Sequence, residues 1–198
     1  IIRFLFFLYT SYNVNVDILK NVNLAKVAAK LAGKNLKDNY ESLNITKLEK
    51  GRDIKLKADL ESEKLIIDFI TSQSDYPILG EETGKSVEDL KDIFWVIDPL
   101  DGTSNYNRGI PISAVSIALV EKNNPVLGVI YDFNTDEMYE GSVSSEALMN
   151  DQPIFVSNIK DKYRGTLVTG LPVAMDYDKK NMQILIENFQ AWKKVRMI

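Results

Sequence analysis

The sequence reads WVIDPLDGTSN from Trp95 to Asn105, and the two halves of this stretch differ in chemistry. The apolar run from Phe94 to Ile97 predicts a buried strand. Two carboxylates follow it, Asp98 and Asp101, and then a glycine, two hydroxyls and an amide. Carboxylates at the end of a buried strand are costly unless a partner compensates them. We expect that partner to be a hard divalent cation such as Mg²⁺, with turn N–H groups offered to an anion.

The same residues would also suit an ordinary turn, because Asp-Pro and Asp-Gly dipeptides are common in turns. The whole string after an apolar strand favours metal-assisted phosphate chemistry instead. One rival motif is excluded by its spacing. Haloacid dehalogenase-type phosphatases use Asp-x-Asp-Gly-Thr with a nucleophilic first Asp, whereas position 99 is Pro here and two residues separate the acids.

Two further acidic elements precede this stretch. Glu81 and Glu82, flanked by glycines, follow the short apolar run from Tyr76 to Leu79. Alone this pair would be typical of a solvated loop, but beside the Asp98 strand it suggests a further metal ligand. Asp59 lies near the start of an amphipathic helix that we expect to end near Ile70, where helix capping is the simpler interpretation.

In this order, the three elements resemble the inositol monophosphatase family of Mg²⁺-dependent, lithium-sensitive phosphatases. The family signature Asp-Pro-hydrophobic-Asp-Gly-Thr-x-Asn is complete from Asp98 to Asn105, and its Gly-Glu-Glu element is present from Gly80 to Glu82. The resemblance spans about Val22 to Gly170. It includes the stretches GIPISAVSIAL (109–119), PVLGVIYD (125–132) and MYEG (138–141).

The resemblance implies a ligand set and a phosphate site. The implied Mg²⁺ ligands are the carboxylates of Glu81, Asp98 and Asp101 and the backbone carbonyl of Leu100, with Asp98 placed to bridge two ions. The implied substrate-binding residues are Asp101, Gly102, Thr103 and Ser104, with the backbone of Gly102 and Thr103 holding the phosphate.

The resemblance also implies catalytic roles. Glu81 and Thr103 would position the attacking water and help to deprotonate it, and Asp59 would hydrogen-bond to Thr103. Glu82 would support this network from behind the ligands. One departure from the family pattern is Leu56, which stands three residues before Asp59 where a Thr is common.

The activity that the resemblance implies is a Mg²⁺-dependent phosphomonoesterase that hydrolyses inositol monophosphate or a related small sugar phosphate with metal-activated water. Two alternatives stay open within the class, a 3′(2′),5′-bisphosphate nucleotidase and a fructose-1,6-bisphosphatase. An alternative of another class is a non-catalytic metal- or phosphate-binding fragment. The expected partner is a small phosphorylated metabolite, and a homodimer is expected for the full-length form.

Composition agrees with a cytoplasmic enzyme. The 198 residues include no Cys and no His, which removes disulfides, thiol chemistry, His-based zinc sites and Ser-His-Asp triads. The net charge of −4 argues against binding a nucleic-acid polymer through a basic surface. The apolar segment from Ile1 to Tyr9 is too short to span a bilayer, so we expect a fragment boundary or a packing segment, with a weak anchor as the alternative, and no membrane among the partners.

The expected fold class is α+β, with a mainly antiparallel sheet packed against helices, as in the layered sugar-phosphatase fold of the family. The expected helices cover 16–41, 60–70 and 179–194. The expected strands lie near Ile78 and at 94–97, 114–121, 126–132, 137–140 and 152–156. Asp132 to Asp136 resembles the start of a calcium-binding loop but lacks its later Gly and Glu, so we expect a hairpin turn.

We expect one domain over residues 1–198, truncated at its C-terminus, because family members continue past the position of Ile198. The C-terminal layers of the fold would then be missing. So would a Trp-Asp motif whose Asp binds metal in the family.

Overall fold

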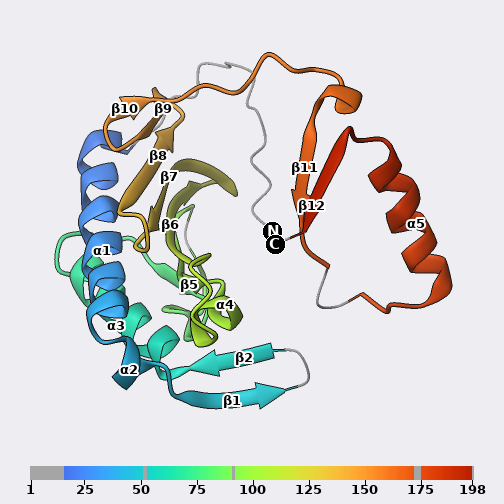
Figure 1. Cartoon of the computed structure of the whole chain (residues 1–198). Coiled ribbons are helices and arrows are strands. Elements are labelled where there is room, and N and C mark those ends of the chain that lie inside the picture. Colours follow the sequence, from blue (N-terminus) through green and yellow to red (C-terminus); the bar gives the residue numbers. More distant parts are fainter. Residues whose placement is uncertain (1–15, 51–52, 91, 172–174, 198) are drawn as a thin grey trace. The chain divides into compact units, whose positions relative to one another are not determined.

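A computed structural model describes residues 16–50, 53–90, 92–171 and 175–197. The chain divides after Ile154 into two compact units (Figure 1). The expectation of a single domain stays a prediction. The apolar segment from Ile1 to Tyr9 lies outside the described residues.

The first unit is built on an eight-stranded sheet, in the order β10-β9-β8-β7-β6-β5-β3-β4. Its strands are β3 (Ile78–Gly80), β4 (Gly84–Lys85), β5 (Ile93–Asp101), β6 (Ala114–Glu121), β7 (Asn124–Asp132), β8 (Glu137–Ser142), β9 (Ser145–Met149) and β10 (Gln152–Pro153). All neighbouring strands are antiparallel except β3 and β5. The α+β class with a mainly antiparallel sheet is therefore confirmed.

Two helices, α1 (Ile18–Asp38) and α3 (Lys57–Thr71), pack on one face of this sheet (Figure 1). The side chain of Asp17 caps α1 by accepting the Lys20 N–H at 3.0 Å. The buried face of α1 is rich in alanine and reaches Gly33, where an added Cβ would lie 2.6 Å from the Tyr131 ring. These small residues let the helix lie close to β7.

The core lies between the helices and the sheet, and the strands alternate accordingly. Val115, Ile117 and Leu119 of β6 are buried, while the residues between them are half-buried. Burying an aliphatic side chain of this size stabilises a fold by about 1.5–3 kcal/mol. The period-two pattern thus fixes which face of the sheet meets the helices.

Several short elements complete the described chain. In the first unit these are α2 (Tyr40–Leu43), the antiparallel pair β1 (Thr46–Lys50) and β2 (Asp53–Leu56), and α4 (Thr103–Asn107). In the second unit they are the 3₁₀ turn η1 (Lys162–Arg164), β11 (Thr166–Thr169), α5 (Lys179–Gln190) and β12 (Lys194–Met197), with β11 and β12 parallel. Sequence patterns predicted α5 but none of the others.

Some predicted boundaries were wrong. The strand expected at 152–156 ends at Pro153, and the helix expected to reach Lys194 ends at Gln190, because Lys194 begins the strand that pairs with β11. The turn after β7 is the predicted hairpin: Asp132 accepts the Asn134 N–H at 2.8 Å, and Asp136 adopts φ 58°.

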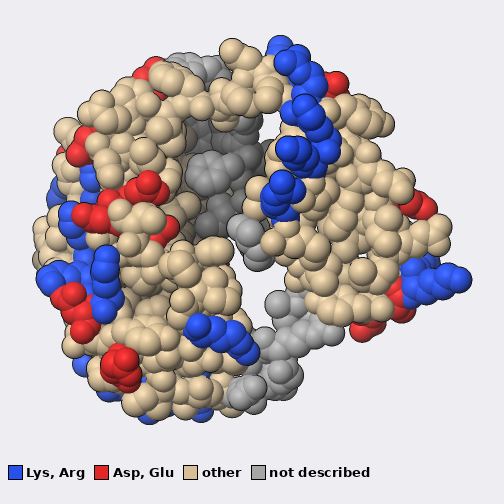
Figure 2. Space-filling view, viewed as in Figure 1, with Lys and Arg blue, Asp and Glu red and all other residues tan. Residues whose placement is uncertain are grey.

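Charges of both signs lie close together over the visible face of the first unit (Figure 2). Two of its ion pairs are Lys34–Asp38, within α1, and Lys26–Asp151, at 2.7 Å. Within the described residues, no helix is both long enough and apolar enough to cross a membrane.

Candidate active site

A bulge in β5 places the two signature acids on one face of the sheet. Asp98 pairs with Ser116, and Asp101 pairs with Ala114. From the first pair to the second, β5 covers three residue steps and β6 only two, so β5 contains one extra residue. One extra residue reverses the alternation of side chains. Asp98 and Asp101 therefore share a face, although three positions in a regular strand would separate them. Pro99, which has no N–H to offer to the ladder, suits this interruption.

The chain turns sharply after Asp101. Gly102 has φ 85°, in the left-handed region, and a Cβ at this position would lie 2.6 Å from the carbonyl oxygen of Ile112. Both facts require glycine here. The same carbonyl accepts a hydrogen bond from the Asn105 side chain at 2.8 Å, which ties α4 to the segment that leads into β6.

Thr103, the first residue of α4, connects this turn to α3. Its hydroxyl lies 2.8 Å from Asp59 Oδ1 and 3.0 Å from the Leu100 carbonyl oxygen. The other oxygen of Asp59 accepts the Leu56 N–H at 2.7 Å and so caps α3. Asp59 is thus both a cap and a partner of Thr103. Burial raises the pKa of its carboxyl above the ordinary value.

Glu81, Asp98 and Asp101 form the negative centre of the site. Burial, the nearby Glu81 carboxylate and then the Asp101 carboxylate raise the pKa of Asp98 to about 8. The Leu100 N–H, 3.2 Å from Asp98 Oδ1, opposes this shift. Crowded carboxylates of this kind are relieved by a divalent cation, so the donor set is compatible with Mg²⁺.

The three carboxylates do not form a closed cage. Among the described residues, no group of three or more acidic side chains is arranged closely enough to hold a metal ion. Like charges keep apart when no cation lies between them, and Glu81 and Asp101 are exposed at the surface. Of these two acids, Glu81 is close enough to share a hydrogen bond with the Asp98 carboxyl, whereas Asp101 acts on it through its charge alone.

Glu82 and Ser104, the two remaining candidate residues, have cationic partners that the sequence did not indicate. Glu82 is nearly buried and accepts from Lys55 Nζ at 2.9 Å, so its carboxylate is turned to β2. Arg108 donates to Ser104 Oγ at 2.7 Å and to the Ser104 carbonyl at 3.1 Å. Arg108 is therefore a cation next to the candidate phosphate turn.

Glu63 is another residue that the sequence analysis missed. It is fully buried, and its two carboxylate oxygens accept the Glu82 N–H at 2.9 Å and the Thr83 N–H at 2.8 Å. Its position four residues after Asp59 in a predicted helix puts both acids on one face, and this spacing was the available signal.

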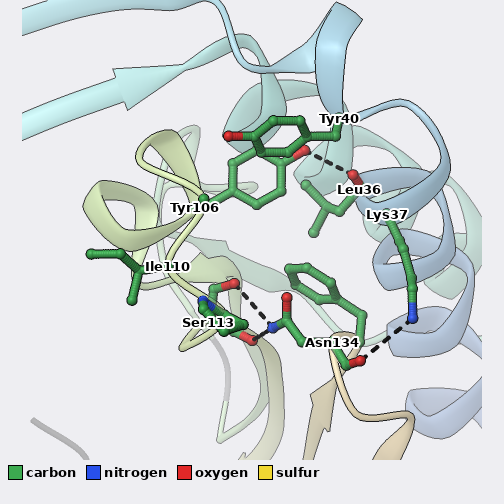
Figure 3. Close-up of a pocket in the computed structure, with 10 residues that line it drawn as sticks. Leu36, Lys37, Tyr40, Tyr106, Ile110, Ser113 and Asn134 are labelled. Atoms are coloured by element: carbon green, nitrogen blue, oxygen red, sulfur yellow. Dashed lines mark hydrogen bonds between the residues drawn. The ribbon is translucent and has the colours of Figure 1, made fainter. Parts of the chain in front are cut away.

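A separate pocket of about 220 Å³ lies beyond α4 (Figure 3). Its lining comes from the end of α1, Tyr40 of α2, Tyr106 of α4, the segment after α4 and the β7–β8 turn, and it contains none of the candidate carboxylates. Tyr106 donates to the Leu36 carbonyl at 2.8 Å and meets Tyr40 edge-to-face. These contacts attach α4 to the end of α1 and to α2.

Comparison with known proteins identifies the class. The model of the inositol monophosphatase family matches residues 17–197, and the chain belongs to this family.

The chain is 41% identical over 154 residues to Nus factor SuhB of Xylella fastidiosa, a match that covers 75% of this chain and 54% of that protein. It is 34% identical over 159 residues to the fructose-1,6-bisphosphatase/inositol-1-monophosphatase of Aquifex aeolicus, covering 79% of this chain and 60% of that protein. The structure of inositol monophosphatase from Anabaena (Nostoc) sp. superposes with a TM-score of 0.74 at 30% identity, covering 92% of this chain and 68% of that one. The chain therefore spans little more than half the length of these curated relatives.

Proposed function

We propose that this chain carries the metal and phosphate site of a Mg²⁺-dependent phosphomonoesterase that acts on inositol monophosphate or a related small sugar phosphate. The observation that carries the proposal is the bulge in β5, which puts Asp98 and Asp101 on one face of the sheet, where Glu81 lies next to Asp98. A cluster of this charge next to a glycine turn suits a divalent cation and the phosphate that it would neutralise.

Four groups would hold the cation: the carboxylates of Glu81, Asp98 and Asp101 and the carbonyl oxygen of Leu100. When bound, Mg²⁺ would supply a Lewis acid for the phosphate oxygens and would lower the pKa of a coordinated water. Glu82 is held by Lys55 and would support the loop without binding the ion.

The remaining residues would orient the water and the phosphate. Thr103 donates its hydroxyl hydrogen to Asp59, which leaves the oxygen lone pairs free to accept a hydrogen bond from the attacking water and so to orient it. Glu81 would take part in deprotonating that water. The Asn105 and Tyr106 N–H groups donate to the Gly102 carbonyl oxygen, at 2.8 and 2.9 Å, so the backbone N–H groups of Gly102 and Thr103 would be the ones that face the phosphate.

The test is release of inorganic phosphate by the purified chain and by the complete protein, with and without Mg²⁺. Inositol 1-phosphate, fructose 1,6-bisphosphate and 3′-phosphoadenosine 5′-phosphate would be compared, with Asp101→Asn as the blank. Mg²⁺-dependent turnover above the blank supports the proposal and ranks the substrates. Absence of Mg²⁺-dependent turnover in the complete protein with every substrate would overturn it.

A second substrate is favoured by one finding. The Aquifex relative carries fructose-1,6-bisphosphatase in its name. Preference for fructose 1,6-bisphosphate over inositol 1-phosphate in the assay above, measured as kcat/KM, would assign that activity to this protein instead.

A further inference from the structure

Glu63 holds the loop that carries Glu81. Both of its carboxylate oxygens accept backbone N–H groups, from Glu82 and Thr83, and the side chain is fully buried. Hydrogen bonds from N–H groups to a carboxylate are stronger than those between neutral groups. The loop is therefore fixed directly after its candidate metal ligand.

The fit between Glu63 and the loop depends on Gly80. A Cβ at position 80 would lie 2.6 Å from the Glu63 carboxyl carbon and from one of its oxygens. The carboxylate therefore occupies the space that any other residue at position 80 would fill. The backbone at Gly80 and the Glu63 carboxylate therefore fit together only because position 80 has no side chain.

Glu63 and Asp59 act on two different loops from one face of α3. Asp59 accepts from Thr103, beyond the end of β5, and Glu63 accepts from the loop beyond β3. One helical turn separates the two acids. A single rigid element thus sets the position of Glu81 relative to Asp98 and Asp101.

We propose that Glu63 is a positioning residue that holds Glu81 next to Asp98 and thereby sets the affinity of the site for a divalent cation. The inference rests on the proposed function. Glu81 is exposed, so its position depends on the backbone that Glu63 holds through the next two N–H groups. Without the two hydrogen bonds to Glu63, the loop would relax away from Asp98, and binding the cation would require it to be ordered again.

The first variant is Glu63→Gln, which keeps the shape but replaces one acceptor with an NH₂ group facing a backbone N–H. Mg²⁺ affinity would be measured by calorimetry on the complete protein, together with the Mg²⁺ concentration that gives half-maximal phosphate release. We expect Mg²⁺ to bind about 10- to 100-fold more weakly, as is usual when a residue that orients a metal ligand is altered. Turnover at saturating Mg²⁺ should stay close to that of the wild type.

Glu121→Gln is the matched control. Glu121 is also a buried glutamate, at the end of β6, and the described residues offer its Oε2 no hydrogen-bond partner. The same substitution there should leave Mg²⁺ affinity unchanged. If Glu63→Gln does not fold, Gly80→Ala gives a second test. The added Cβ would displace the Glu63 carboxylate while the glutamate itself remains in the sequence.

The outcomes separate the two proposals. Weaker Mg²⁺ binding in Glu63→Gln or Gly80→Ala, with unchanged binding in Glu121→Gln, supports the role of Glu63. Wild-type Mg²⁺ affinity in a folded Glu63→Gln variant, or reduced turnover at saturating Mg²⁺ with unchanged affinity, overturns that role and leaves the proposed function intact. A wild-type protein that does not bind Mg²⁺ overturns both.

Discussion

At the scale of single residues, Asp101 is the most direct test of the metal site. It is exposed, so Asp101→Asn should change the free energy of unfolding by about 0.5 kcal/mol or less. We expect the substitution to abolish Mg²⁺-dependent phosphate release by the complete protein. Glu82→Gln should be milder, because Glu82 is engaged by Lys55. Equal loss of activity in both variants would contradict the roles assigned to the two acids.

Thr103 links the phosphate turn to α3 through its hydroxyl. Thr103→Val keeps the shape but leaves an oxygen of the buried Asp59 without this donor. We expect the free energy of unfolding to fall by about 1–3 kcal/mol and turnover by about 10²- to 10⁴-fold. Urea unfolding and phosphate release would measure the two effects. Thr103→Ser retains the hydroxyl, and its activity should remain close to that of the wild type.

Gly102 can be tested against a second glycine of similar backbone conformation. Gly84 has φ 73° with no atom within 4 Å of an added Cβ, whereas a Cβ at Gly102 would meet the Ile112 carbonyl oxygen. Gly84→Ala should therefore cost only the conformational term, about 1–2 kcal/mol. Gly102→Ala should cost more and reduce phosphate release. Equal unfolding midpoints for the two variants would show that the contact with Ile112 is not important.

At the scale of elements, the close packing of α1 on β7 should be sensitive to volume. Gly33→Ala places a Cβ against the Tyr131 ring and should cost about 1–3 kcal/mol, despite the better helix propensity of alanine. Lys30→Ala, at an exposed position of the same helix, should change stability by about 0.5 kcal/mol or less. Thermal unfolding of the two variants would measure this difference.

The elements that the sequence predicted well are those whose pattern comes from the core. The strand from Ala114 to Glu121 was predicted with its observed bounds because buried and half-buried residues alternate along it. The pair β1–β2 was missed because Thr46–Lys50 reads TKLEK, without an apolar period. The start of α3 at Lys57 was also missed, since its N-cap residue is Leu56, which carries no capping side chain.

The sequence indicated which residues form the candidate site, but not the residues that hold them in place. The motif located the acids and Thr103, and the structure contains the hydrogen bond from Thr103 to Asp59 that the family resemblance implied. The contacts of Lys55 with Glu82, and of Glu63 with the Glu82 and Thr83 N–H groups, are long-range in the sequence, so no local pattern reports these partners. The contact of Arg108 with Ser104 is local, four residues apart, and was missed because the motif ends before Arg108.

At the scale of the whole molecule, a bound cation should raise the stability of the folded state. Mg²⁺ at 100 times its dissociation constant adds about 2.7 kcal/mol to the free energy of unfolding if the unfolded chain does not bind it. We expect the thermal midpoint of the complete protein to rise with Mg²⁺ and to return to its starting value with EDTA. The Asp101→Asn variant should show a smaller rise. A midpoint independent of Mg²⁺ in the wild type would contradict the metal site.

The dual contact of Asp59 makes the beginning of α3 and the assembly of the site a single cooperative event. One carboxylate oxygen secures the first turn of the helix while the other orients the hydroxyl of Thr103. When that turn frays, the hydroxyl loses its orientation at the same moment. Amide exchange at the Leu56 N–H therefore reports how often the resting protein loses a competent site, without any substrate being present.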